Sequence, residues 1–195
     1  MEEEKIIQQI ADIVRKCGQI MLDAEHVKET VTAKEGHGNF VTFYDRKIQD
    51  ILEKELTALL PESRFMGEET ADADAGGSYM PDYDKGLVFV VDPIDGTTNF
   101  IKGYRNSAVS VGLLNDGKPY MAVIYNPYQD EMFTAVKGCG TQVNGRAVRV
   151  SENKLADGLA VFGTAIYYDG SAGPTFKRAF DYFTHALDIR RSGSK

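Results

Sequence analysis

The sequence predicts a layered α/β fold that forms one domain over residues 1–195. Two segments near the N-terminus have helical periodicity, short apolar runs separated by turn residues fill the middle, and a strand-like run and a helical run follow. Of the 195 residues, 43% are hydrophobic and 26% are charged, which is typical of a globular domain. A disordered chain and a collagen-like chain are therefore excluded.

The two N-terminal segments are expected to be amphipathic helices. In the first, residues 6–23, apolar side chains recur every three or four positions. The second has its apolar residues between 48 and 60 and ends at Pro61, because proline cannot continue a helix. The polar segment 28–39 between them is interpreted as a loop or a pair of short strands.

The rest of the chain is expected to consist of strands joined by tight turns, followed by one helix. Residues 71–81, rich in glycine, alanine and aspartate, are expected to be a loop before the strands begin. The predicted strands are 87–91, 108–114, 120–125, 131–136 and 159–165, with turns at 115–118 and at Asn144-Gly145. A final helix, 174–187, has Phe176, Ala179, Phe180 and Phe183 on one face.

The charge and cysteine content exclude several classes of partner. The formal net charge is −7, with no lysine or arginine stripe, which argues against nucleic-acid binding. No apolar stretch approaches membrane-spanning length and the acidic N-terminus has no apolar signal core, so no membrane partner is expected. The two cysteines, Cys17 and Cys139, lie far apart without disulfide or metal spacing, which predicts a cytoplasmic protein.

The strongest functional signal is a pair of carboxylates, Asp92 and Asp95, at the end of the apolar strand 87–91. Mg²⁺ prefers such oxygen ligands and usually keeps waters that a substrate can replace. The backbone N–H groups of Gly96 and Thr97, next in the chain, are suited to form an anion-binding nest for a phosphate. Metal and phosphate sites on one loop predict phosphoryl chemistry. The alternative is that these acidic residues only solvate a turn.

Three motifs carry a resemblance to a known family. They are Asn39-Phe40-Val41-Thr42-Phe43-Tyr44-Asp45, Phe65-Met66-Gly67-Glu68-Glu69 and Asp92-Pro93-Ile94-Asp95-Gly96-Thr97-Thr98-Asn99-Phe100. In order and spacing they resemble the motifs of the inositol monophosphatase family, which are Mg²⁺-dependent, lithium-sensitive sugar phosphatases. The resemblance continues to residues 189–194. It implies an αβαβα sandwich, two or three Mg²⁺ ions in a complete site, inhibition by lithium and a possible homodimer.

The resemblance implies a metal-binding set of oxygen ligands. Glu68, Asp92 and the Ile94 carbonyl correspond to the ligands of the first metal. Asp92 also bridges to the second metal, which Asp95 helps to bind. Glu69 corresponds to a residue that orients a metal-bound water without joining the ligands.

The resemblance also implies a catalytic pair, Thr97 and Asp45, which orients the attacking water. A carboxylate that holds the hydroxyl can accept the proton that the water gives up. The alternative for Asp45 is a helix-start residue stabilised by the helix dipole, and both roles can hold together. Gly96 and Thr97 are the expected phosphate-binding residues.

The main departure from the family lies at the C-terminal end. Family members continue past the element that residues 190–194 match, and their later part supplies a Trp-Asp motif for the second metal, so the last sheet and helices are expected to be missing here. The leading hypothesis is a Mg²⁺-dependent phosphomonoesterase that hydrolyses inositol monophosphate or a related sugar or nucleotide phosphate by direct attack of metal-activated water. The alternative is a truncated, weakly active or inactive metal- and phosphate-binding fragment that acts through a partner chain.

Overall fold

The computed structural model describes residues 2–33, 40–69, 83–163 and 172–193. Its centre is a seven-stranded mixed sheet in which the strands follow chain order from β3 to β9. The strands are β3 (Arg64–Gly67), β4 (Leu87–Asp95), β5 (Ala108–Asn115), β6 (Lys118–Asn126), β7 (Glu131–Val136), β8 (Gly140–Val143) and β9 (Arg146–Val148). Only β3 and β4 run parallel, and every later neighbour is antiparallel.

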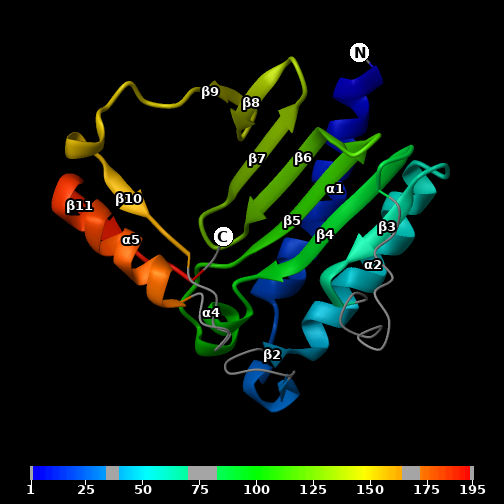
Figure 1. Cartoon of the computed structure of the whole chain (residues 1–195). Helices are drawn as coiled ribbons and strands as arrows, with labels where there is room; N and C mark the ends of the chain where they lie inside the picture. Colours follow the sequence, from blue (N-terminus) through cyan, green and yellow to red (C-terminus); the bar gives the residue numbers. More distant parts are fainter. Residues whose placement is uncertain (1, 34–39, 70–82, 164–171, 194–195) are drawn as a thin grey trace.

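Two long helices, α1 (Glu2–Leu22) and α2 (Phe43–Leu59), pack together on one face of this sheet (Figure 1). Helix α1 contacts β5, β6 and β7, whereas α2 contacts β3 and β4. Their apolar stripes form the core with the facing strand residues. The fully buried side chains include Val14, Ile48, Leu52, Leu56, Phe89, Val109 and Val123.

Strand β6 shows how the sheet separates its two faces. Met121, Val123 and Tyr125 are buried under the helices, whereas Ile124, which points to the other face, is 42% exposed. Successive side chains of a strand alternate between faces, so one face of β6 is core and the other is not. The sheet therefore has one helix-covered apolar side.

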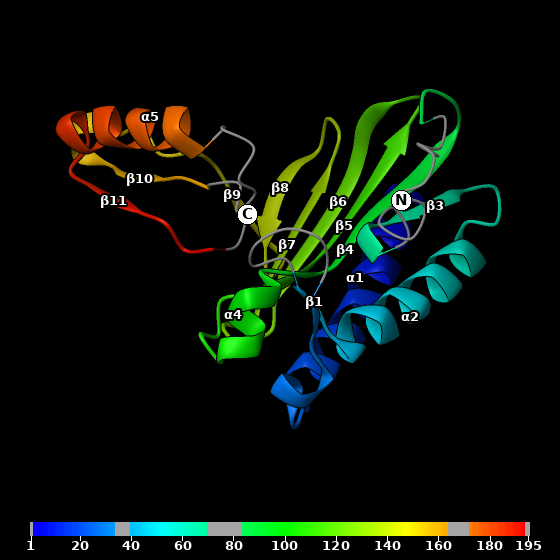
Figure 2. The same ribbon diagram turned by 60° about the horizontal axis from the view of Figure 1, so that its bottom comes forward.

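A smaller layer lies beside the main sheet. Strands β10 (Leu159–Val161) and β11 (Asp188–Arg190) form a parallel pair, and helix α5 (Ala172–His185) packs along it (Figure 2). Near α2, β1 (Thr32–Ala33) pairs antiparallel with β2 (Phe40–Val41). The remaining elements are the 3₁₀ turns η1 (Val27–Thr30) and η2 (Leu155–Asp157) and the short helix α4 (Thr97–Lys102).

The element predictions agree with this structure for the long helices and most of the strands, with the following differences. Strand β4 continues to Asp95, past the expected end at residue 91, because its irregular end still pairs with β5. The strand predicted over 159–165 is β10, which ends at Val161, and residues 164–165 lie outside the described residues. Its partner β11 and strand β3 were not predicted. The face of α5 that carries Phe176, Phe180 and Phe183 is more than half exposed at each of these residues, although Ala179 is buried. The predicted loop 71–81 lies outside the described residues.

Within the described residues, no helix combines the length and the apolarity that crossing a bilayer requires. The two turns expected at residues 115–118 and at Asn144-Gly145 are present. In both, two consecutive residues adopt positive φ, as two-residue hairpin turns need: Asp116 with Gly117, and Asn144 with Gly145.

Candidate functional site

The candidate site forms where the parallel strands β3 and β4 end. Gly67 is the register partner of Val91, so Glu68 and Asp92 are the next residues of two adjacent strands running in the same direction. In open α/β sheets, ligands bind beyond the carboxyl ends of parallel strands. The pairing therefore brings two of the sequence motifs, about 25 residues apart in the chain, to one edge of the sheet.

The end of β4 is irregular, and this irregularity sets the direction of its acidic residues. The β4–β5 register shifts between Asp92, opposite Ser110, and Asp95, opposite Ala108. Bulges of this kind re-aim side chains and are frequent beside active sites. Asp95 is buried, and Asp92 is half-buried with its Oδ1 atom shielded from solvent. The side chain of Ile94 belongs to the core, which leaves its carbonyl oxygen as the group that can take part in the site.

A hydroxyl and a carboxylate meet across two elements at this end of β4. The Oγ1 atom of Thr97, the first residue of α4, lies 3.3 Å from Oδ1 of Asp45 and 3.1 Å from the Ile94 carbonyl oxygen. One hydroxyl has one proton, so Thr97 donates to one of these acceptors at a time. The predicted catalytic pair is thus in hydrogen-bond range.

Asp45 is held in place by the start of helix α2. Thr42 is the N-cap: its Oγ1 accepts the Asp45 N–H at 3.3 Å and its own N–H donates to Asp45 Oδ2 at 2.7 Å, which forms a capping box. The Thr42 hydroxyl also donates to Oδ2 at 2.5 Å. Burial raises the pKa of the Asp45 carboxyl, and the hydrogen bonds from Thr42 and Thr97 oppose that rise. The helix-start role and the catalytic placement therefore coexist in Asp45, as the sequence allowed.

Gly96 joins β4 to α4 in a conformation that suits glycine. Its φ of 85° lies in the left-handed region, where a side chain would be strained. Its carbonyl accepts hydrogen bonds from the Phe100 N–H at 3.0 Å and the Ser107 hydroxyl at 2.9 Å. The turn that was predicted to bind phosphate is thereby fixed from both sides.

Sequence reasoning missed Gln49, which anchors the Glu68-Glu69 segment. Gln49 lies one turn after Asp45 on the buried side of α2, and its Oε1 accepts the Glu69 N–H at 2.9 Å. A Cβ atom on Gly67 would lie only 2.1 Å from that Oε1 atom, so glycine makes this approach possible. A polar residue on an otherwise apolar helix stripe, four positions after a predicted catalytic residue, was the available signal.

A second missed residue, Asn99, ties the C-terminal segment to the site. Its Nδ2 atom donates to the carbonyl oxygens of Asn106 at 2.7 Å and Ser192 at 2.8 Å. These bonds attach the segment after β11, where the last family-like element lies, to helix α4. Of that element Ser194 lies outside the described residues.

The structure brings some of the predicted site residues into contact and leaves others apart. Asp45, Ile94 and Thr97 are joined by hydrogen-bond distances, whereas Glu68 is exposed and Glu69 half-buried. Among the described residues, no group of three or more His, Cys, Asp or Glu side chains converges as a metal site. The oxygen-only chemistry of Glu68, Asp92 and Asp95 suits Mg²⁺, so their role as its ligands stays a prediction.

Comparison with protein families supports the motif assignment. The family model described as "Inositol monophosphatase family" matches residues 2–194. Nus factor SuhB of Vibrio cholerae is 33% identical over 92% of this chain and 66% of its own length. Inositol-1-monophosphatase of Rhizobium meliloti is 32% identical over 100% of this chain and 71% of its own length. The chain spans between 49% and 66% of the length of three of the curated relatives that it matches.

Solved structures share the fold. The extragenic suppressor protein suhB from Bartonella henselae is 30% identical with a TM-score of 0.83, covering 97% of this chain and 70% of its own. An IMPase of Thermotoga maritima is 29% identical with a TM-score of 0.76, covering 94% and 66%. A staphylococcal inositol monophosphatase, solved as a LiCl-soaked inhibitory complex, has a TM-score of 0.72 over 96% and 63% and, at 21% identity, shows the fold alone. The layered α/β prediction is confirmed.

Proposed function

Because the chain belongs to the inositol monophosphatase family, we propose that it is a Mg²⁺-dependent phosphomonoesterase. It hydrolyses inositol monophosphate or a related sugar or nucleotide phosphate by direct attack of water. The observation that carries the proposal is the contact of Thr97 Oγ1 with Asp45 Oδ1 at 3.3 Å, across 52 residues of chain. This contact lies at the end of the strand that carries Asp92 and Asp95.

The proposed metal residues are Glu68, Asp92, Asp95 and the Ile94 carbonyl, with Glu69 supporting them. Bound Mg²⁺ would polarise the attacking water and neutralise the phosphate oxygens. Without Mg²⁺, these acidic residues would repel an anionic ester, and the net charge of −7 on the chain would add to that repulsion. Gly96 and Thr97 are the proposed phosphate-binding residues, through backbone N–H groups at the turn.

The proposed chemistry is one in-line displacement. Thr97 Oγ1 accepts a proton from the attacking water as its own proton passes to Asp45 Oδ1. The water oxygen forms a bond to phosphorus as the ester P–O bond breaks, and the leaving alkoxide takes a proton from solvent. A raised pKa makes the Asp45 carboxylate a better proton acceptor near neutral pH than an ordinary aspartate.

A second candidate is a chain that binds metal and phosphate but needs a partner chain for turnover. The exposed aromatic face of α5 favours it, because three large apolar side chains, Phe176, Phe180 and Phe183, are more than half exposed there. A homodimer is one form that such a partnership can take.

For both candidate functions the proposed location is the cytoplasm. Both cysteines are free thiols, Cys17 buried and Cys139 exposed, as is usual for proteins of a reducing compartment.

Phosphate release from inositol 1-phosphate, with and without Mg²⁺, tests the proposal. We expect Mg²⁺-dependent release that Asp92→Asn abolishes. Thr97→Val should lose about 10²- to 10⁴-fold in kcat because it removes the proton relay, and Thr97→Ser should retain most of the rate because it keeps the hydroxyl.

The same assay separates the two candidates. Fructose 1,6-bisphosphate, 3′-phosphoadenosine 5′-phosphate and histidinol phosphate complete the substrate panel. If no ester gives release above the Asp92→Asn background, the phosphomonoesterase proposal fails for the isolated chain. Metal binding that persists under those conditions, measured by calorimetry, would then favour the partner-dependent candidate.

A further inference from the structure

A cavity of about 530 Å³ lies at the end of α4 away from Thr97. Its walls come from the end of α1 with η1 on one side, and from the end of α4 with the β6–β7 turn on the other. It takes no part in the proposed phosphatase chemistry. A volume of this size falls in the range of small-molecule sites, roughly 300–1,000 Å³.

The inner wall of the cavity is apolar. Met21, Phe100 and Ile101 line it and are buried, with exposures of 2%, 5% and 8%. Val27 and Tyr128 add half-buried surface. This wall is continuous with the core, because Phe100 also stacks edge-on against Tyr44 with ring centroids 5.9 Å apart. An apolar molecular body is therefore favoured against it.

The rim of the cavity is basic in a chain that is acidic overall. Lys28, Lys102 and Arg105 are exposed there, and no hydrogen bond or ion pair is recorded for their side chains within the described residues. The acidic residue of the rim, Glu29, already faces His26, with Oε1 3.3 Å from Nδ1. Among the described residues that line the opening, three cations thus outnumber one carboxylate, which gives the rim a net positive charge.

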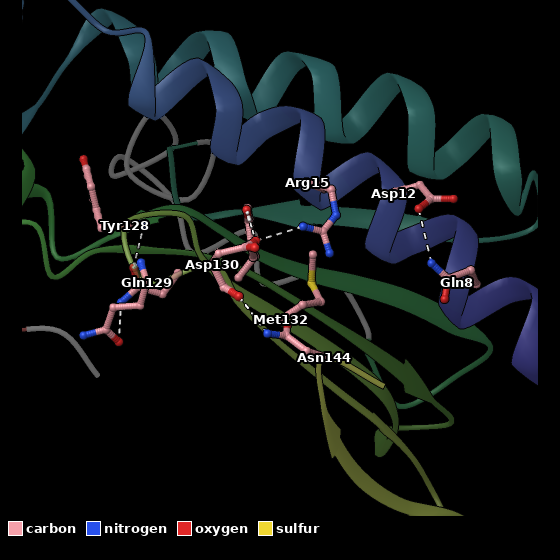
Figure 3. A network of polar contacts seen from close by, with 10 residues as sticks. Gln8, Asp12, Arg15, Tyr128, Gln129, Asp130, Met132 and Asn144 are labelled. Atoms are coloured by element: carbon pink, nitrogen blue, oxygen red, sulfur yellow. Dashed lines mark hydrogen bonds and ion pairs between the residues drawn. The ribbon is translucent and has the colours of Figure 1, made fainter. Parts of the chain in front are cut away.

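The wall that carries Tyr128 is held by a polar network (Figure 3). Asp130 receives Arg15 at 3.1 Å and the Tyr125 hydroxyl at 2.9 Å, and its carbonyl accepts the Asn144 amide at 2.8 Å. The Tyr128 ring extends away from this network (Figure 3). Burial raises the pKa of the Tyr128 phenol, and the charge of Arg105 opposes that rise.

Two rim residues have unusual backbone. His26 and Arg105 are non-glycine residues with φ of 53° and 55°. Left-handed backbone is strained for such residues, so the surrounding structure must hold it in place. The surrounding structure therefore fixes the backbone on both sides of the opening, at His26 and at Arg105.

We propose that this cavity binds an organic anion, whose apolar ring system lies against Met21, Phe100 and Tyr128 and whose acidic group faces Lys28, Lys102 and Arg105. Carboxylate, sulfonate and phosphate groups share the required chemistry. Inorganic phosphate alone lacks the apolar part, and a neutral ring system lacks the charge. The ligand class is thus defined by the two surfaces together.

Fluorescence titration with 1-anilinonaphthalene-8-sulfonate, in metal-free buffer without phosphate ester, tests the proposal. The double variant Lys28→Gln/Arg105→Asn removes two rim charges, and asparagine tolerates the left-handed backbone at position 105. We expect its affinity for the sulfonate to fall about fivefold, because each exposed charge contributes only modestly to binding. The neutral probe N-phenyl-1-naphthylamine should bind both proteins equally and more weakly than the sulfonate binds the unmodified chain.

The matched control is Lys54→Gln/Arg149→Asn, which removes the same two charges from exposed positions away from the cavity. An equal loss of sulfonate affinity in this control would overturn the proposal, and so would an affinity of the unmodified chain for the neutral probe as high as its affinity for the sulfonate. The variant Phe180→Ser tests whether the probe binds the exposed face of α5 instead. Loss of the sulfonate signal in this variant, with no loss in the rim double variant, would also overturn the proposal. Circular dichroism confirms that each variant is folded.

Discussion

Helices α2 and α5 have the same kind of amphipathic sequence pattern, but their apolar faces are buried to different extents. In α2, the apolar stripe is fully buried at Ile48, Leu52 and Leu56. In α5, the stripe is 57% exposed at Phe176 and 64% exposed at Phe180. Both helices are amphipathic, but α2 faces a broad sheet and α5 faces two three-residue strands.

This difference shows that periodicity selects a helix and its apolar face, whereas burial depends on what that face meets. A helix gains most of its stability in a protein from packing its apolar face. The α2 face meets β3 and β4 and the neighbouring helix α1. Among the described residues, the α5 face meets the short strand β11, and Phe176 makes an edge-on contact with Phe162, with ring centroids 6.4 Å apart.

The largest expected effect on stability comes from truncating a buried apolar residue of α2 rather than an exposed one of α5. Leu52→Ala should lower the free energy of unfolding by about 2–5 kcal/mol, because it leaves a cavity in a fully buried stripe. Phe180→Ala should cost less than about 1 kcal/mol, since that ring is mostly in water. Urea unfolding measures both. Equal costs would show that α5 is covered in solution.

A smaller effect is expected where α2 meets β3. Gly67→Ala places a Cβ atom against the Gln49 amide and should cost about 1–3 kcal/mol by overpacking. The matched control is Gly112→Ala in β5, where the nearest atom to the new Cβ lies at an ordinary 3.7 Å. In a Gln49→Ala background the Gly67→Ala cost should shrink, because the clashing group is gone. If Gly67→Ala costs as much in the Gln49→Ala background, the clash with the Gln49 amide is not the cause of its destabilisation.

The smallest expected effect concerns the cap of α2. Thr42→Ala should cost about 1 kcal/mol, because it removes the hydroxyl that caps the helix and holds Asp45. Thr42→Ser should retain most of the stability. Thr57→Ala, which removes a hydroxyl bonded to the Glu53 carbonyl inside the same helix, is expected to be neutral or slightly stabilising. Thermal unfolding at fixed pH compares the three, and a Thr57 effect as large as that of Thr42 would contradict the capping role.

Much of the fold could be predicted because local rules act on neighbouring residues. The apolar spacing located α1 and α2, and the turn chemistry of Asn144-Gly145 located a hairpin. The motif order identified the family and brought forward Asp45, Asp92 and Thr97 as site residues. The contacts of Gln49 and Asn99 were not predicted, because each side chain bonds a backbone group that only folding brings near.

By itself, the sequence determined the helices, most of the strands and the residue types of the candidate site. These follow from side-chain periodicity and composition, which need no knowledge of distant neighbours. Tertiary structure alone decided that Thr97 reaches Asp45, that β3 pairs in parallel with β4, and that the α5 aromatics stay exposed. Each depends on contacts between residues distant in the chain, and burial energy belongs to the pair of surfaces that meet rather than to either segment.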